Sequence, residues 1–86
     1  MACHNIMTIL VNNRRSNASN LQNLLTSSGC IIQTRLGLHE AKEACSEEGL
    51  IILQLVGSKE DIAILECELN GLDGIKAKNL EICGDW

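Results

Sequence analysis

The chain has 86 residues, of which 45% are hydrophobic and 21% charged, and it contains no proline. This length allows one small domain, and the composition is that of a folded protein rather than a disordered one. Seven basic and eleven acidic residues leave a net charge of −4, and the basic residues are scattered along the chain. We therefore expect no nucleic-acid partner and no anionic membrane surface as a partner.

The longest apolar runs, residues 6–11 and 50–56, are far shorter than the roughly 20 residues that a membrane-spanning helix needs. The N-terminal residues also lack the charged, apolar and small-residue succession of a signal peptide. We therefore expect the protein to stay in the cytoplasm.

The first half of the chain predicts a strand, a helix and a second strand. Residues 5–12 form a β-rich apolar run that is too short for a helix. From Ser16 the apolar residues recur at helical spacing, with Ser16 or Asn17 as the N-cap and Gly29 as the left-handed residue after the last turn. Residues 30–37 then return to a strand pattern.

The second half predicts the same succession. Residues 50–56 form an almost wholly apolar strand, and Ser58 with Asp61 resembles a capping box at the start of a helix. A turn at Gly74 leads into a last strand at residues 75–83. The buried stripe of the second helix is predicted to be Ile62, Leu65, Leu69 and Leu72.

These elements follow the order β-α-β-β-α-β, with a weak internal repeat between the two halves. Right-handed crossovers would interleave the two split β-α-β units into one four-stranded antiparallel sheet with both helices on one face. The sequence therefore predicts an α+β fold, the ferredoxin-like plait, as a single domain over residues 1–86.

The two central strands of this sheet are apolar on both sides. Alternation places one set toward the helices: Met7, Ile9, Val11, Ile51, Leu53 and Leu55. The other set would lie on the open face: Ile6, Thr8, Leu10, Leu50, Ile52, Gln54 and Val56. Because two helices cover only one face, we expect a homo-oligomer, a dimer or tetramer, that covers the other. The alternative is a monomer with an unusually apolar sheet.

The five cysteines are an odd number, and no two form a Cys-x-x-Cys pair, so no disulfide framework is expected. Cys30, Cys67 and Cys83 lie in or beside apolar runs and are interpreted as small buried hydrophobic residues. Cys3, beside His4, and Cys45 lie in polar stretches, where a metal or redox role is conceivable.

A candidate anion-binding segment follows the first strand. It comprises Asn12, Asn13, Arg14, Arg15, Ser16 and Asn17. Free backbone N–H groups, a helix dipole and two guanidinium groups could hold a carboxylate or phosphate there, although a solvated loop is the alternative. We place Gly57 and Ser58 at the same end of the sheet, so that both helix N-termini would point toward the segment.

Arg35 is the predicted charged neighbour of this segment. We assign it to the open face with Ile31 and Gln33, from which an adjacent subunit could bring it toward the ligand. The alternative is that Arg35 pairs with an acid such as Glu48 or Glu81 across an interface.

The acidic loop at residues 38–48 contains His39, Glu43 and Cys45, which could in principle bind a divalent ion. One histidine and one cysteine fall short of a closed tetrahedral set unless another subunit contributes, so a solvated hairpin tip is preferred and no metal or cofactor is expected. No catalytic triad or carboxylate pair can be built from this sequence, and we therefore expect no enzyme.

Four stretches resemble a known family: Thr-Arg-Leu-Gly-Leu-His-Glu at 34–40, Glu-Gly-Leu-Ile-Ile-Leu at 48–53, Leu-Val-Gly at 55–57 and Leu-Asp-Gly-Ile-Lys-Ala-Lys at 72–78. Together they resemble the small iron-only hydrogenase system regulators. The resemblance covers residues 5–82, the expected core. It implies a stand-alone ACT-like domain that assembles through its sheets, has no helix-turn-helix, and takes part in regulating the hydrogenase or its maturation.

A weaker similarity connects the chain to the C-terminal domain of nickel-responsive repressors, which binds metal near the end of the second strand. The chain has Arg35, Leu36, Gly37 and Leu38 where that comparison would want alternating histidines. Nickel binding is therefore not expected.

Two classes of function follow. The preferred one is a regulatory module in which an amino acid or other small carboxylate binds at a subunit interface, between residues 12–17 and a neighbouring sheet. A purely structural oligomer is its simpler competitor. The other class is a metal or redox sensor that uses His39 and Cys45, with Cys3 and His4, across an interface.

Overall fold

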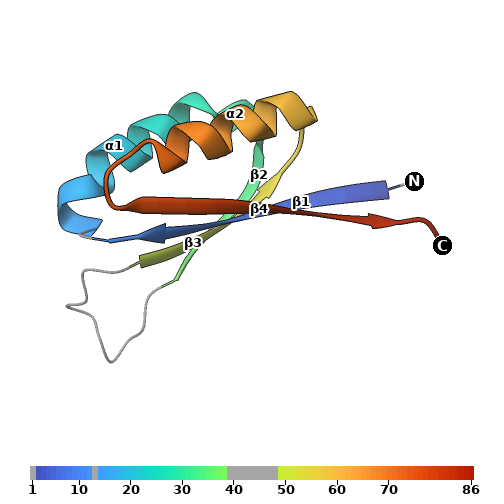
Figure 1. Cartoon of the computed structure of the whole chain (residues 1–86), viewed down its shortest axis with the longest axis horizontal. Coiled ribbons are helices and arrows are strands. Elements are labelled where there is room, and N and C mark those ends of the chain that lie inside the picture. The colour runs from blue at the N-terminus through green and yellow to red at the C-terminus, as the bar shows by residue number, and fades with distance from the viewer. Residues whose placement is uncertain (1, 13, 39–48) are drawn as a thin grey trace.

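The computed structural model describes residues 2–12, 14–38 and 49–86, with the backbone alone for residues 14–18 and 38. The elements occur in the predicted order of strand, helix, two strands, helix and strand (Figure 1). They are β1 (Ala2–Val11), α1 (Arg14–Ser27), the 3-10 helix η1 (Gly29–Ile31), β2 (Ile32–Leu38), β3 (Gly49–Leu55), α2 (Lys59–Asn70) and β4 (Ile75–Gly84).

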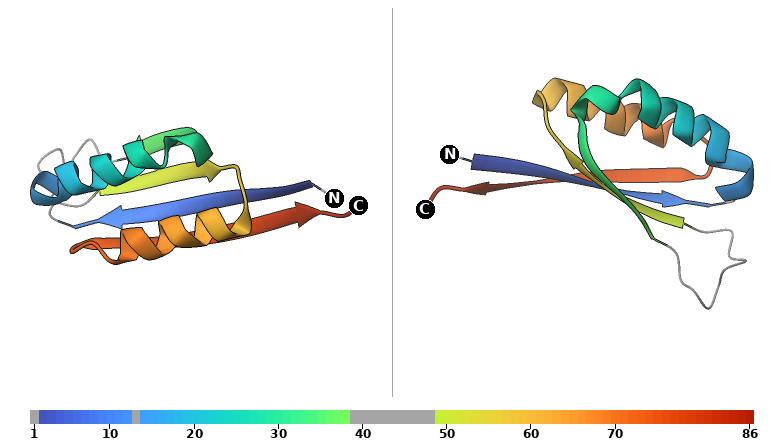
Figure 2. Two further views of the ribbon diagram at one scale, coloured as in Figure 1. Left: turned by 90° about the horizontal axis from the view of Figure 1, so that it is seen from above. Right: turned by 180° about the vertical axis from the view of Figure 1, so that it is seen from behind.

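The four strands form one antiparallel sheet in the order β2-β3-β1-β4. The two strands predicted to be central, β1 and β3, are therefore central. Both helices lie on the same face of the sheet, and the described strands are bare on the other face (Figures 1 and 2). This arrangement confirms the α+β fold and the ferredoxin-like plait.

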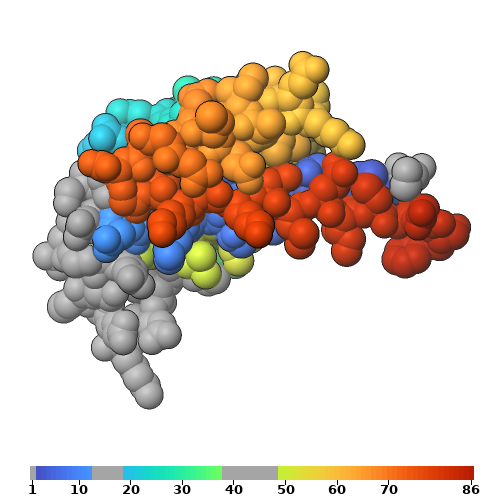
Figure 3. Space-filling model, in the orientation of Figure 1, coloured from blue at the N-terminus to red at the C-terminus, as the bar shows by residue number. Residues whose placement is uncertain are grey.

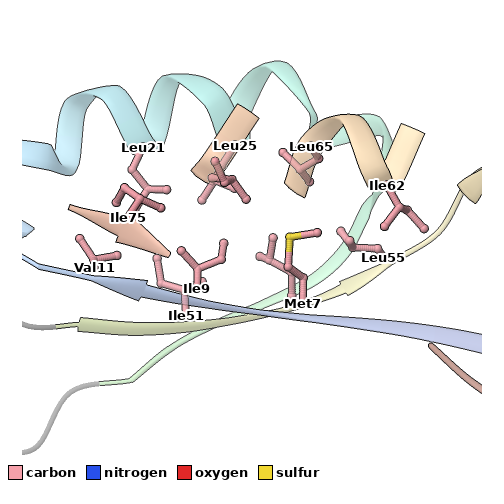
Figure 4. Close-up of a cluster of buried hydrophobic side chains, with 12 residues drawn as sticks. Met7, Ile9, Val11, Leu21, Leu25, Ile51, Leu55, Ile62, Leu65 and Ile75 are labelled. Atoms are coloured by element: carbon pink, nitrogen blue, oxygen red, sulfur yellow. The ribbon is translucent and has the colours of Figure 1, made fainter. Parts of the chain in front are cut away.

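The hydrophobic core lies between the helices and the sheet (Figure 4). It contains all six residues predicted to face the helices from β1 and β3, and the three predicted positions Ile62, Leu65 and Leu69 of α2. Leu72 packs against its edge. Burying a side chain of this size stabilises the fold by about 1.5–3 kcal/mol, so the alternation along two strands determines which face carries the helices.

The start of α2 matches the predicted cap. The Ser58 hydroxyl accepts a hydrogen bond from the Asp61 backbone N–H at 3.0 Å. Gly57, directly before it, has a φ of 121°, and Gly74 has a φ of 72° where the chain turns into β4. Both turns therefore use a backbone conformation that residues with a Cβ rarely adopt.

The predicted caps of α1 are wrong at both ends. The helix begins at Arg14, so Ser16 and Asn17 lie in its first turn and are not its N-cap. Gly29 does not have a positive φ and instead opens η1. A 3-10 turn can end a helix with i to i+3 bonds alone, which is why no left-handed residue is needed.

A β-bulge in β2 changes which residues of this strand face the helices. Ile32 pairs with Leu55, but the register shifts by one residue before Thr34 pairs with Gln54. Because side chains alternate with a period of two, the extra residue reverses the faces from that point onward. The predicted facing of β2 is therefore wrong beyond the bulge.

β1 begins at Ala2 rather than at residue 5, and β4 ends at Gly84 rather than at residue 83. The start of β1 and the end of β4 lie side by side where the chain begins and ends (Figures 2 and 3). Cys3 is paired directly with Cys83 across the two strands, and the two residues form a disulfide. The interpretation of Cys83 as a free buried residue is thus wrong. Cys30 in η1 and Cys67 in α2 are free and exposed, so their interpretation as buried residues is wrong as well.

In the part of the chain that the structure describes, no helix has the length and apolar character needed to cross a membrane.

Candidate functional site

The open face is the surface of the sheet that lies opposite the helices. Strand register places on it, in rows that run across the strands, the described residues Thr34, Leu36, Leu50, Ile52, Gln54, Ile6, Thr8, Leu10, Lys76, Lys78, Leu80 and Ile82, and Ala2 and His4 at the start of β1. Most of the large apolar members are well exposed, with Leu10 at 44%, Leu36 at 52% and Leu80 at 65%.

The formal charges on the open face are positive. Lys76 and Lys78 alternate with apolar residues along β4, opposite Leu10 and Thr8 of β1. No aspartate or glutamate belongs to the described rows of this face. The open face is therefore an apolar surface with a cationic border along the edge strand β4.

A shallow pocket lies at the end of the sheet where β1 ends and β4 begins. Its volume is about 270 Å³, and it is lined by Leu10, Asn12, Gly74, Ile75 and Lys76. The Asn12 backbone N–H donates to the Gly74 carbonyl at 2.7 Å and ties the two strand ends together. The pocket thus combines one ammonium group with polar backbone and an apolar wall. We call it the rim pocket, because Leu10 and Lys76 also belong to the open face.

The predicted anion-binding segment lies partly at the rim pocket. Asn12 lines the pocket, and the backbone of Arg14, Arg15, Ser16 and Asn17 forms the first turn of α1 two residues later. Asn13 and the side chains of residues 14–17 lie outside the part of the chain that the structure describes. The prediction of a loop over residues 14–17 is wrong, since they are helical.

Arg35 does not join this site. The bulge in β2 turns it to the helix-bearing face, opposite Leu53, where its guanidinium donates to the Gln22 side chain of α1 at 2.9 Å. Leu53, the partner of Arg35, is itself paired with Met7 of β1. Met7 and Asn12 are five residues apart, which corresponds to about 17 Å along the strand at 3.4 Å per residue. The assignment of Arg35 to the open face is therefore wrong.

Gly57 and Ser58 also lie away from the rim pocket. The register pairs Val11 with Gly49 and Asn5 with Leu55, so the end of β3 lies at the opposite end of the sheet from the end of β1. The two helices accordingly start at opposite ends (Figure 1). The predicted convergence of two helix N-termini overlooked that β1 and β3 are antiparallel neighbours.

Three of the weak metal candidates, His39, Glu43 and Cys45, lie outside the described residues. Cys3 and His4 are consecutive in β1, so their side chains lie on opposite faces and do not form one site. A cluster that the sequence interpretation missed consists of Cys3, Glu81 and Cys83, whose ligand atoms all lie within 4.8 Å of one another.

A polar patch lies next to this cluster on the β1–β4 ladder. The Asn79 backbone N–H donates to the Glu66 carboxylate at 2.5 Å, and the Asn79 amide donates to the Asn5 side chain at 3.0 Å. Lys59 lies 3.7 Å from the Glu81 carboxylate. α2 is thereby fixed to β4 by polar contacts at its outer edge.

The comparisons with known proteins give structural neighbours. No protein-family model matches the chain, and no curated protein matches it. The uncharacterized protein TM1266 from Thermotoga maritima is similar with a TM-score of 0.82 and 23% sequence identity, over 95% of this chain and 100% of that one. CPII, a nitrogen regulatory PII-like protein from Thiomonas intermedia, is similar with a TM-score of 0.54 and 11% identity, over 95% and 97% of the two chains. The structure of CPII contains ADP, AMP and bicarbonate. At these identities the likeness shows a shared fold.

Proposed function

We propose that the protein is a non-enzymatic regulatory module that assembles with copies of itself through the open face and binds a small anion at the rim pocket. The observation that carries the proposal is the exposure of large apolar side chains over a whole sheet face. Monomers rarely expose a contiguous apolar surface of more than a few hundred Å².

A second copy of the chain is the occupant that fits the open face best. Apolar side chains on Leu36, Ile52 and Leu80 span the sheet from the edge strand β2 to the edge strand β4. A two-fold axis would bring this surface against itself, with the apolar rows in the centre. Lys76 and Lys78 would then border the interface, where water and counter-ions screen their charge. A dimer is the smallest such assembly, and a tetramer needs a further contact.

An anion is the ligand that suits the rim pocket. Lys76 supplies an ammonium group, and a carboxylate or phosphate would form charge-assisted hydrogen bonds with it. Since Leu10 and Lys76 belong to both the pocket and the open face, a subunit seated on that face would border the ligand. Binding could thereby stabilise one assembly over another, which is a simple way to make an oligomer respond to a metabolite.

The structural likeness to CPII suggests which anions to test first. The ligands in that structure, ADP, AMP and bicarbonate, all carry negative charge. Small carboxylates such as amino acids are the second class. The resemblance to the iron-only hydrogenase system regulators makes hydrogenase activity in a deletion strain the first cellular property to measure.

Light scattering at micromolar concentration tests the assembly, and titration calorimetry with ADP, AMP, bicarbonate and amino acids tests the ligand. We expect an oligomer, and we expect Lys76→Ala to weaken anion binding at least tenfold. The matched control is Lys59→Ala, which removes an exposed lysine from α2 on the other side of the sheet. A stable monomer would refute the assembly. Binding that Lys76→Ala leaves unchanged would refute the rim pocket, and an oligomer that binds none of these anions would favour a purely structural role.

A further inference from the structure

The strongest unassigned group of side chains lies at the far end of the β1–β4 ladder, away from the rim pocket. Register pairs Cys3 with Cys83 and Asn5 with Glu81, so Cys3, Glu81 and Cys83 share the helix-bearing face of the sheet. The Cα atoms of the two cysteines are 4.0 Å apart. Two strands therefore bring two sulfur atoms and a carboxylate from opposite ends of the chain to one place.

The spacing of these atoms suits a metal ion. In a tetrahedral zinc site with Zn–S bonds of about 2.3 Å, neighbouring ligand atoms are roughly 3.8 Å apart. In the structure the Sγ atoms of Cys3 and Cys83 are bonded to each other, and a carboxylate oxygen of Glu81 lies within 4.8 Å of both. Once the S–S bond is reduced, the two sulfur atoms must move apart, and rotation of the cysteine side chains can then bring the three ligand atoms to this spacing. Thiolate and carboxylate are both zinc ligands in proteins, and a water molecule can complete the set.

We propose that Cys3, Glu81 and Cys83 bind one zinc ion when the Cys3–Cys83 disulfide is reduced. An external dithiol supplies the two electrons and two protons: its own thiols become a disulfide, the S–S bond of the protein breaks, and both cysteines become thiols. Zinc then displaces the two thiol protons to the solvent and forms two Zn–S bonds and one Zn–O bond. The disulfide and the metal site exclude each other, because each uses both sulfur atoms.

The surroundings allow both reactions. Cys3 is exposed and Cys83 is only partly buried, so a dithiol and a hydrated metal ion can reach the sulfur atoms. Lys59 lies 3.7 Å from the Glu81 carboxylate and would oppose a second positive charge there. Removing this lysine should therefore strengthen zinc binding, whereas it would have no such effect on a site elsewhere.

The inference is independent of the proposed anion site. The rim pocket lies at the Val11–Ile75 end of the β1–β4 ladder, and the cysteine pair lies at the Ala2–Gly84 end. The protein can thus fail to bind anions and still bind zinc, or the reverse.

The test uses full-length protein purified without a histidine tag, with Cys30, Cys45 and Cys67 replaced by alanine so that only the two site cysteines remain. Zinc is measured by elemental analysis after dialysis with and without a dithiol reductant. We expect a single zinc ion per chain in the reduced protein and none in the oxidised protein. Equal zinc in the two states, or none in either, would overturn the proposal.

Variants in the same background identify the ligands. Cys3→Ser and Cys83→Ser should each lower zinc affinity by more than a hundredfold, Glu81→Gln by at least tenfold, and Lys59→Gln should raise it a few fold. With cobalt in place of zinc, the sulfur-to-metal charge-transfer band should be lost in both the Cys3→Ser and the Cys83→Ser variant. It should be kept in Glu81→Gln. Lys76→Gln, at the other end of the sheet, is the control and should change nothing. An affinity that Glu81→Gln leaves unchanged would overturn the three-residue site.

Discussion

Ile52 and Leu53 are consecutive residues of β3 whose side chains lie on opposite faces of the sheet. Leu53 has 0% exposure and packs in the core, opposite Met7 of β1. Ile52 is partly buried on the open face, between Thr8 and Leu36. The same substitution at these two neighbours therefore tests two different layers of the protein.

We predict that Leu53→Asp prevents folding and that Ile52→Asp dissociates the assembly into folded monomers. A charge at Leu53 would be buried without a partner, and even Leu53→Ala should lower the free energy of unfolding by about 2–5 kcal/mol. Circular dichroism reports the fold and light scattering the mass. If both variants are folded oligomers, or both unfold, the assignment of the two faces to different roles is wrong.

The core could be predicted from the sequence because alternation in β1 and β3 is regular. Every predicted inward residue of these two strands is buried, including Val11 and Ile51 near the sheet end. Neither strand contains a bulge in its pairing with the other. A pattern with a period of two is therefore sufficient to identify the face that the helices cover.

The site was harder to predict because it depends on register and direction. One extra residue in β2 reversed the facing of Arg35, and no turn residue or charge in the sequence marks that bulge. The direction of the strands could be predicted, since the plait makes β1 and β3 antiparallel neighbours. This alone places Gly57 at the opposite end of the sheet from Asn12. The same plait makes the first strand and the last antiparallel neighbours, which places Cys3 and Cys83 at the same end of that ladder, but only the observed register pairs them directly.

The Cys3–Cys83 disulfide should contribute strongly to stability, because it encloses almost the whole chain. The two cysteines are separated by 80 residues in the sequence, and the chain-entropy model gives a stabilisation of about 4.5 kcal/mol for a loop of this size. We expect a reductant to lower the free energy of unfolding in urea by about 2–4 kcal/mol. The double variant Cys30→Ala with Cys67→Ala is the control and should keep this response. An unfolding curve that does not shift on reduction would contradict the prediction.

Gly57 and Gly37 should respond oppositely to the same substitution. Gly57 has a φ of 121°, and a Cβ there would lie 3.1 Å from Ile31 Cγ2, so Gly57→Ala should lower the free energy of unfolding by about 1–3 kcal/mol. Gly37 has ordinary strand geometry, and a Cβ there meets nothing within 4 Å. Gly37→Ala should be neutral or stabilise by up to about 1 kcal/mol. Urea denaturation measures both, and equal losses would show that strain at Gly57 is not the cause.

The cap of α2 gives the last prediction. The Ser58 hydroxyl accepts the Asp61 N–H at 3.0 Å, one of the N–H groups that have no partner within the helix, and Ser58→Ala should therefore cost about 1 kcal/mol of stability. Ser27 is the matched control, because its hydroxyl donates to the Leu24 carbonyl at 2.8 Å in the last turn of α1 and caps no N–H group. We expect Ser27→Ala to change stability by less than about 0.5 kcal/mol. Ser58→Asp should restore most of the loss, since a carboxylate accepts the same bond and favours the positive end of the helix dipole. If aspartate is no better than alanine at this position, the bond between Ser58 and Asp61 does not stabilise the start of α2.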